Sequence, residues 1–158
     1  MESRIEFSKV NPDALSAMYA LEAYVQGSII EQSLIDLVKI RASQINGCAF
    51  CIDMHTKEAR ARGESEQRLY LLDAWREAQF YTERERAALE WAESLTLVSS
   101  TRVPDDVFER VRRHLSEAEL VDLSMAMVAI NSWNRLCIAF RAIPGSFQAP
   151  TRHAKADA

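Results

Sequence analysis

The chain has 158 residues, of which 48% are hydrophobic and 27% are charged, and its formal net charge is −4. This composition fits one globular domain with a sizeable core, and the acidic balance argues against a nucleic-acid-binding protein. No apolar run approaches the roughly 20 residues that cross a bilayer, and no apolar stretch follows the first residues as it would in a signal peptide. We therefore expect a cytoplasmic protein that binds neither nucleic acid nor membrane.

Patterns with the helical period dominate the chain, which contains only four glycines and four prolines. Capping signals mark several helix starts: Asn11 precedes Pro12, and capping boxes begin at Thr82 and Ser116. Residues 98–102 are predicted to form a loop. The fold class is therefore all-α, and the predicted helices cover residues 12–27, 32–44, 48–62, 65–74, 82–95, 104–115 and 117–141.

No linker, repeat or low-complexity stretch divides the chain. We predict a single helical domain over residues 1–147 and a flexible C-terminal tail over residues 148–158, where the periodic pattern stops. The helix predicted at 117–141 is mostly apolar. That pattern favours burial on more than one side of the helix, including a side at a subunit interface.

The segment Cys48-Ala49-Phe50-Cys51-Ile52-Asp53-Met54-His55 carries the strongest chemical signal. Residues three or four apart share a helix face, so Cys48, Cys51 and His55 are expected on one stripe, with the cysteine Cα atoms about 5 Å apart. A nearby base and a helix N-terminus both favour the reactive thiolate. His55 supplies the base, and a helix beginning near Gly47 supplies the N-terminus. The pattern indicates a redox dithiol.

The cysteines also allow other interpretations. In a reducing compartment a CxxC pair is more often redox-active or metal-binding than a structural disulfide. Cys48, Cys51 and His55 are plausible zinc ligands with Asp36 as a fourth, so a zinc site is a rival, as is a pair of inert buried thiols. Cys137 has apolar neighbours in the sequence and no nearby base. We predict that it is an inert thiol of the core.

Residues 36–56 around the dithiol, residues 82–91 and residues 131–136 resemble the AhpD-like superfamily, which includes the alkylhydroperoxidase AhpD and carboxymuconolactone decarboxylase families. The resemblance spans most of positions 12–145. It implies an AhpD-like helical bundle that assembles into a homo-oligomer, either a hexamer or a trimer.

The active site of that family is a carboxylate, the CxxC pair and a histidine four residues after the second cysteine. The resemblance therefore implies Cys48, Cys51, His55 and Asp36 as catalytic residues. The family usually has glutamate at the position of Asp36, which is one methylene shorter, so a water would bridge it to His55. AhpD also has a histidine where this chain has Phe50, which implies lower peroxidase activity or a different substrate.

These observations predict a thiol-dependent peroxidase. Cys51 would attack a hydroperoxide and become a sulfenic acid, and Cys48 would then close a disulfide, although a helix N-terminus favours Cys48 as the more acidic thiol. The chain has no glycine-rich nucleotide motif, so no cofactor is expected, and the resemblance implies an external dithiol reductant of lipoyl or similar type. Two alternatives stay open: a carboxymuconolactone decarboxylase-type lyase, which does not rely on a CxxC pair, and a non-catalytic redox-sensing protein.

Overall fold

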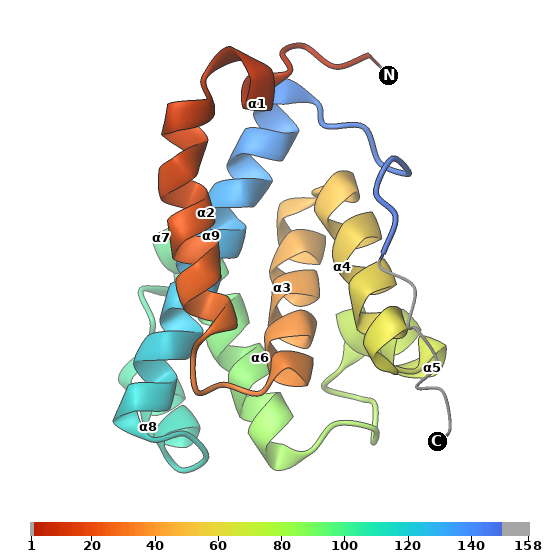
Figure 1. The fold of residues 1–158 in the computed structure, drawn as a ribbon. Coiled ribbons are helices and arrows are strands. Elements are labelled where there is room, and N and C mark those ends of the chain that lie inside the picture. Colours follow the sequence, from red (N-terminus) through yellow and green to blue (C-terminus); the bar gives the residue numbers. More distant parts are fainter. Residues whose placement is uncertain (1, 150–158) are drawn as a thin grey trace, which may run out of the picture.

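The helices expected from the sequence are present in the computed structural model, which describes residues 2–149 (Figure 1). All regular elements in this range are helical, which confirms the all-α class. The elements are α1 (Phe7–Val10), α2 (Pro12–Gln26), α3 (Gln32–Asn46), α4 (Ala49–Arg62), α5 (Glu66–Leu71), the 3-10 turn η1 (Leu72–Ala74), α6 (Glu83–Thr96), α7 (Val98–Thr101), α8 (Asp105–Arg112) and α9 (Glu117–Phe140).

The differences from prediction concern single turns. The predicted loop at 98–102 contains α7, a turn of four residues, and α1 was not predicted at all. The helix expected at 65–74 ends at Leu71 and continues as the 3-10 turn η1. Elements this short do not complete a hydrophobic period, so the sequence pattern does not reveal them. Residues 150–158 of the predicted tail lie outside the described residues.

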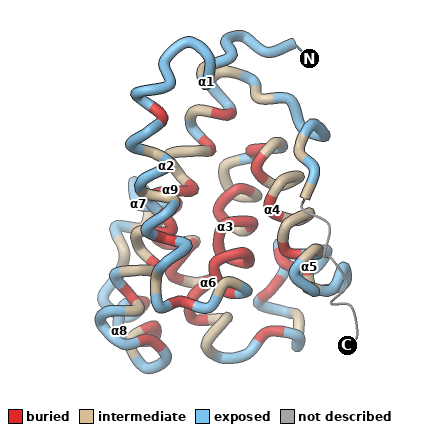
Figure 2. The backbone as a smooth tube through the Cα atoms, in the orientation of Figure 1, coloured by how far each residue is buried: buried red, intermediate tan, exposed pale blue. Residues whose placement is uncertain are grey.

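Helix α3 is the centre of the molecule. It packs against α4, α6 and α9, and most of its length is buried (Figures 1 and 2). The predicted core positions Leu34, Leu37, Val38 and Ile40 are all buried. The polar residues Asp36, Lys39 and Ser43 of α3 are buried as well and need partners within the protein.

A tight turn joins α3 to α4 and fixes the start of the dithiol segment. Gly47 has a φ of 69°, a left-handed conformation that glycine adopts without strain. Its N–H donates to the carbonyl of Gln44, and the N–H of Cys48 donates to the carbonyl of Ser43 at 2.9 Å. The turn therefore holds Cys48 at the N-cap of α4, close to the C-terminal end of α3.

Helix α9 begins at the predicted capping box, in which Ser116 and Glu119 bond each other's backbone N–H groups. It packs against α2, α3 and α6. Its other side exposes Val121, Val128 and Ile138, so burial on more than one side is not present within the single chain. The subunit interface expected on this helix stays a prediction.

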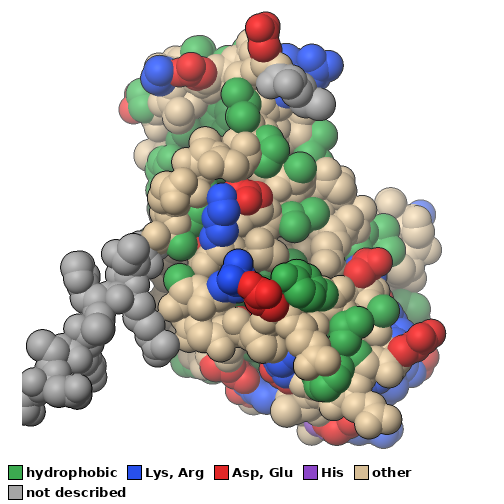
Figure 3. Space-filling model, turned by 90° about the vertical axis from the view of Figure 1, so that its right-hand side faces the viewer, with side chains coloured by type: hydrophobic (Ala, Val, Ile, Leu, Met, Phe, Trp, Pro, Cys, Tyr) green, Lys and Arg blue, Asp and Glu red, His purple; other side chains and the backbone are tan. Residues whose placement is uncertain are grey.

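The surface and the helix lengths bear on possible partners. Within residues 2–149, every helix is too short or too polar to span a lipid bilayer. On the face shown in Figure 3, lysine and arginine side chains lie beside aspartate and glutamate side chains. This face therefore has no basic patch of the kind that nucleic-acid binding uses.

Candidate active site

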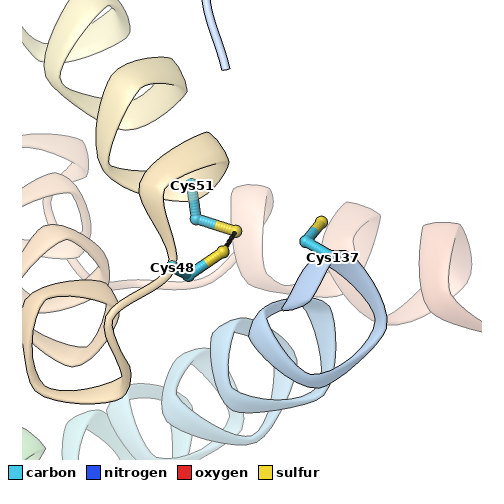
Figure 4. Close-up of side chains that lie close together, drawn as sticks. All are labelled: Cys48, Cys51 and Cys137. Atoms are coloured by element: carbon cyan, nitrogen blue, oxygen red, sulfur yellow. Dashed lines mark hydrogen bonds between the residues drawn. The ribbon is translucent and has the colours of Figure 1, made fainter. Parts of the chain in front are cut away.

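The two cysteines of the CxxC motif lie together at the N-terminus of α4 (Figure 4). Cys48 is the N-cap residue and Cys51 is on the first turn. Their Sγ atoms are 2.8 Å apart, within hydrogen-bond reach, and each residue is about 1% exposed. Both are free thiols. The structure thus brings together the sulfur pair that the spacing predicted.

Cys137 joins this pair from another part of the chain. It is on the last turns of α9, and its side chain lies opposite the CxxC sulfurs (Figure 4). The three Sγ atoms all lie within 4.8 Å of one another, and Cys137 is 5% exposed. Its burial agrees with the sequence prediction. Its place in the site was missed, because no local pattern places it beside Cys48 and Cys51.

The three thiols differ in acidity. Hydrogen bonding to Cys137 and to Cys51 lowers the pKa of Cys48 to about 3, and Asn134 adds to this effect. Hydrogen bonding to Cys137 and Cys48, together with burial, raises the pKa of Cys51 above its ordinary value. Hydrogen bonding to Cys48, with burial, raises the pKa of Cys137 to about 12. The cluster therefore favours a single thiolate on Cys48, where the helix N-terminus also favours negative charge.

A network of amides holds α9 to the turn between α3 and α4. The side-chain N–H of Asn134 donates to Ser43 Oγ at 3.1 Å, and Asn46 donates to Asn134 Oδ1 at 2.8 Å. Ser43 is the residue whose carbonyl accepts from Cys48 N–H. Asn134 is fully buried, so its bonds fix the position of α9 against Cys48. In the sequence, Asn134 is part of a segment that resembles the superfamily and of the apolar helix predicted to be buried, but no pattern there predicts its hydrogen bonds.

His55 is buried one turn beyond Cys51, and its partner is Glu58. Its Nδ1 atom lies 3.0 Å from Glu58 Oε2. A proton on Nδ1 directed at the carboxylate leaves Nε2 free to accept a proton. Burial alone would raise the pKa of Glu58, but the hydrogen bond from His55 and the charges of Arg62 and Lys39 outweigh it and hold that pKa below its usual value. Glu58 therefore stays ionised and orients the imidazole.

Asp36 has Arg62 and Gln32 as its side-chain partners. Its carboxylate accepts two hydrogen bonds from the Arg62 guanidinium, at 2.7 and 2.6 Å, and a third from Gln32 at 2.8 Å. Arg62 also lies 3.6 Å from Glu58. Arg62 and Glu58 therefore link Asp36 to His55, and the water bridge expected from the resemblance stays a prediction. Glu58 was missed, although its spacing of three residues from His55 is a signal for a side-chain pair on a helix.

One cavity of about 620 Å³ joins these groups. Cys51, Cys137 and His55 are on its wall, whereas Cys48 is not among the lining residues. Tyr19 and Trp133 pack in its wall with ring centroids 5.6 Å apart and ring planes tilted by 47°. The remaining lining residues are apolar, neutral polar or charged: Phe7, Ser8, Glu22, Gln26, Gln32, Asp36, Lys39, Phe50, Met54, Glu58 and Arg62. A cavity with this volume and this mixture of lining residues is typical of a site that binds a small molecule.

The zinc site considered from the sequence is not assembled. That hypothesis used Cys48, Cys51, His55 and Asp36, but among the described residues neither His55 nor Asp36 belongs to the group of ligand atoms that lie close together. Within residues 2–149, the ligand atoms that come together are the sulfurs of Cys48, Cys51 and Cys137.

Comparison with known proteins identifies close relatives. The family model of the carboxymuconolactone decarboxylase family matches residues 12–94. The uncharacterized protein YdfG of Bacillus subtilis is 49% identical over 139 residues, which are 88% of this chain and 95% of YdfG. The uncharacterized protein YnjA of Escherichia coli is 31% identical over 56% of this chain and 48% of its own length.

Solved structures extend the comparison to the fold. A protein of unknown function from Agrobacterium tumefaciens, provisionally named an antioxidant defence protein AhpD, is 48% identical with a TM-score of 0.87, covering 95% of this chain and 99% of that chain. The debrominase Bmp8 is 22% identical with a TM-score of 0.76, covering 86% of this chain and 73% of its own. At that identity the likeness to Bmp8 concerns the fold alone.

Proposed function

This chain belongs to the carboxymuconolactone decarboxylase family of the AhpD-like superfamily, and from that premise we propose that it is a dithiol-dependent peroxidase. One observation carries the proposal: Cys51, 2.8 Å from the Cys48 sulfur, shares the wall of one cavity with His55, which Glu58 orients. Such a site combines a nucleophile, a second thiol that can trap its oxidised form, and a base.

Cys51 is proposed as the sulfur that meets the hydroperoxide, because it lines the cavity and Cys48 does not. The acidity of the thiols favours Cys48 as the resting thiolate. A Cys48 thiolate with so low a pKa is a weak base, so it does not take the proton of Cys51. We assign that proton to Nε2 of His55, because His55 is on the same cavity wall as Cys51.

The two cysteines supply both electrons of the proposed reaction. The Cys51 thiolate attacks the terminal peroxide oxygen, the O–O bond breaks, and the alkoxide leaves and takes the proton held by His55 to become an alcohol. Cys51 is then a sulfenic acid. The Cys48 thiolate attacks the Cys51 sulfur, hydroxide leaves and takes a proton from solvent to become water, and a disulfide forms. An external dithiol reduces that disulfide by exchange, so each turnover consumes one hydroperoxide and two electrons.

The cavity supports an organic hydroperoxide with an apolar body as the substrate class. Tyr19, Phe50 and Trp133 supply aromatic surface to the cavity wall. The charged groups of the cavity are already paired, Asp36 with Arg62 and Glu22 with Lys39. An uncharged substrate would leave those pairs intact, whereas a charged one would have to break one of them. The homo-oligomer and the cytoplasmic location expected from the sequence remain predictions.

Steady-state consumption of hydroperoxide tests the proposal. Purified protein with cumene hydroperoxide or hydrogen peroxide is supplied with dithiothreitol or dihydrolipoamide, and peroxide loss is followed over many equivalents. We expect turnover with the wild type, faster with the aromatic hydroperoxide, and a loss of at least about 100-fold in Cys51→Ser. The exposed Ser99→Ala variant is the matched control and should equal the wild type.

The same assay separates the alternatives. A redox-sensing protein would form the disulfide with one equivalent of peroxide but would not turn over when reductant is present. A lyase of the decarboxylase type would show no peroxide loss, and a Cys48→Ser/Cys51→Ser double variant would keep its activity on the lactone substrate. Either result would contradict the peroxidase proposal.

A further inference from the structure

We propose that Cys137 is a third redox-active thiol of the site, which takes Cys51 as its disulfide partner after the Cys48–Cys51 disulfide has formed. This inference rests on the proposed function in one respect only: the hydroperoxide is the oxidant that forms the first disulfide. It assigns a chemical role to a residue whose sequence neighbours predict an inert core thiol.

The position of Cys137 carries the inference. Its Sγ lies within 4.8 Å of both CxxC sulfurs. A disulfide needs an approach to about 2 Å, so the side chains and the helices that carry them have to close the remaining distance. Helices α4 and α9 are in contact, and the Asn134 network holds α9 against the turn that carries Cys48. The three sulfurs therefore stay together as a fixed cluster.

The cavity wall distinguishes the possible disulfides. Cys51 and Cys137 line the cavity, whereas Cys48 does not. A Cys48–Cys51 disulfide therefore offers the cavity one sulfur, and a Cys51–Cys137 disulfide offers both. A dithiol reductant that enters the cavity can attack either sulfur of the second form, so moving the bridge onto Cys137 makes it easier to reduce.

The exchange step needs no further oxidant or reductant. Cys137 gives its proton to solvent in the cavity and attacks Cys51 Sγ. With Cys48 held in the disulfide, the Cys48 charge that helps to raise the pKa of Cys137 is absent. The bond from Cys51 to Cys48 breaks and Cys48 leaves with the electron pair as a thiolate, so one reduced sulfur and one disulfide are present before and after. Cys48 is the favoured leaving group, because the site lowers the pKa of its thiol and a more acidic thiol leaves faster.

Oxidation of a Cys48→Ser variant tests the inference without relying on peroxidase activity. Diamide, which oxidises pairs of nearby thiols, is added to the folded full-length variant, and the remaining thiols are counted. Only Cys51 and Cys137 remain in this variant. We expect both thiols to be lost and a Cys51–Cys137 disulfide to form within one chain.

Tryptic mapping without reduction identifies the bridge. Cleavage after Arg41 and Lys57 leaves Cys48 and Cys51 on one peptide, and cleavage after Arg135 and Arg141 leaves Cys137 on another. Peptides 42–57 and 136–141 joined to each other are therefore the signature of the proposed disulfide. The matched control, Cys48→Ser/Cys137→Ser, should give no bridge and should retain one thiol per chain.

Two free thiols after diamide in a folded Cys48→Ser variant, or disulfides only between chains, would overturn the inference. Circular dichroism matched to the wild type establishes that the variant is folded. If it does not fold, mapping of the diamide-oxidised wild type decides: peptide 42–57 joined to 136–141 supports the inference, and only a loop within 42–57 overturns it. Peroxide turnover without a Cys137 bridge would leave the proposed function standing, and a bridge without turnover would leave only the inference.

Discussion

The sulfur cluster and the charged side chains of the cavity wall are built differently. In the sulfur cluster, three buried thiols lie against one another with amide and helix-terminus donors around them. Among the charged side chains, each named group has an opposite partner, as Asp36 has Arg62 and Glu22 has Lys39. The sulfurs can therefore exchange protons and bonds, whereas the charged groups are fixed and serve to hold helices and the imidazole in place.

The largest expected effect is the acidity of Cys48. Because hydrogen bonding to Cys137 and Cys51 lowers its pKa to about 3, the thiolate should be present across the neutral range and should be protonated only in strong acid. Thiolate absorbance at 240 nm, titrated from pH 9 downward, measures this. Wild-type protein should keep one thiolate at pH 6, and Cys48→Ser should lose it. Equal absorbance in the two proteins at pH 6 would show that the charge lies elsewhere.

Replacing the imidazole tests how the charged side chains serve the sulfurs. In His55→Gln the cavity wall loses its base, and we expect kcat for hydroperoxide to fall by about 100-fold, the lower range for loss of a general base. The thiol count and the 240 nm absorbance should not change, because the charge on Cys48 is set by its sulfur and amide neighbours. Unchanged kcat would mean that the imidazole is not the base that activates Cys51.

Asp36 should matter for stability more than for rate. Asp36→Asn removes a carboxylate that bonds Arg62 across α3 and α4, and we expect a loss of about 2 kcal/mol in the free energy of unfolding, below the value for a fully buried pair because Arg62 is 42% exposed. Urea denaturation measures it. The change in kcat should be under about fivefold. A loss of rate as large as that of His55→Gln would restore the direct role that the resemblance implied.

Of the four residues changed in these tests, Glu58 should have the smallest effect. The effect should be on the reaction rate. Glu58→Gln keeps the side-chain length but removes the charge that orients His55, so we expect kcat to fall by about tenfold with little loss of stability. The pH–rate profile should shift, which a merely structural role would not cause, and Glu58→Asp should recover part of the rate. A wild-type profile in Glu58→Gln would exclude the pairing with His55.

The sequence reveals the parts of the site that depend on local spacing. Cys48, Cys51 and His55 are placed by helix geometry and by the turn at Gly47, so their juxtaposition could be predicted. The helices could be predicted for the same reason, except for single turns such as α7. Glu58 depends on the same geometry, three residues from His55, and could have been found by searching that face of α4 for acidic residues.

The remaining parts depend on packing between distant segments. Arg62 meets Asp36 because α3 and α4 are antiparallel neighbours, and Cys137 meets the dithiol because Asn134 bonds Ser43 and Asn46 at the end of α3. Periodicity predicts that α9 is buried, but not which of its turns faces α4. The cavity and its third thiol therefore appear only in the folded chain.

The most direct test of the account is the stoichiometry of a single turnover. One equivalent of hydroperoxide is added to fully reduced protein without reductant, and free thiols and alcohol product are both counted. The chain has three cysteines, and we predict that one thiol remains per chain while one equivalent of alcohol forms. Three thiols left beside unconsumed hydroperoxide would contradict the claim that this cluster of sulfurs reduces peroxides.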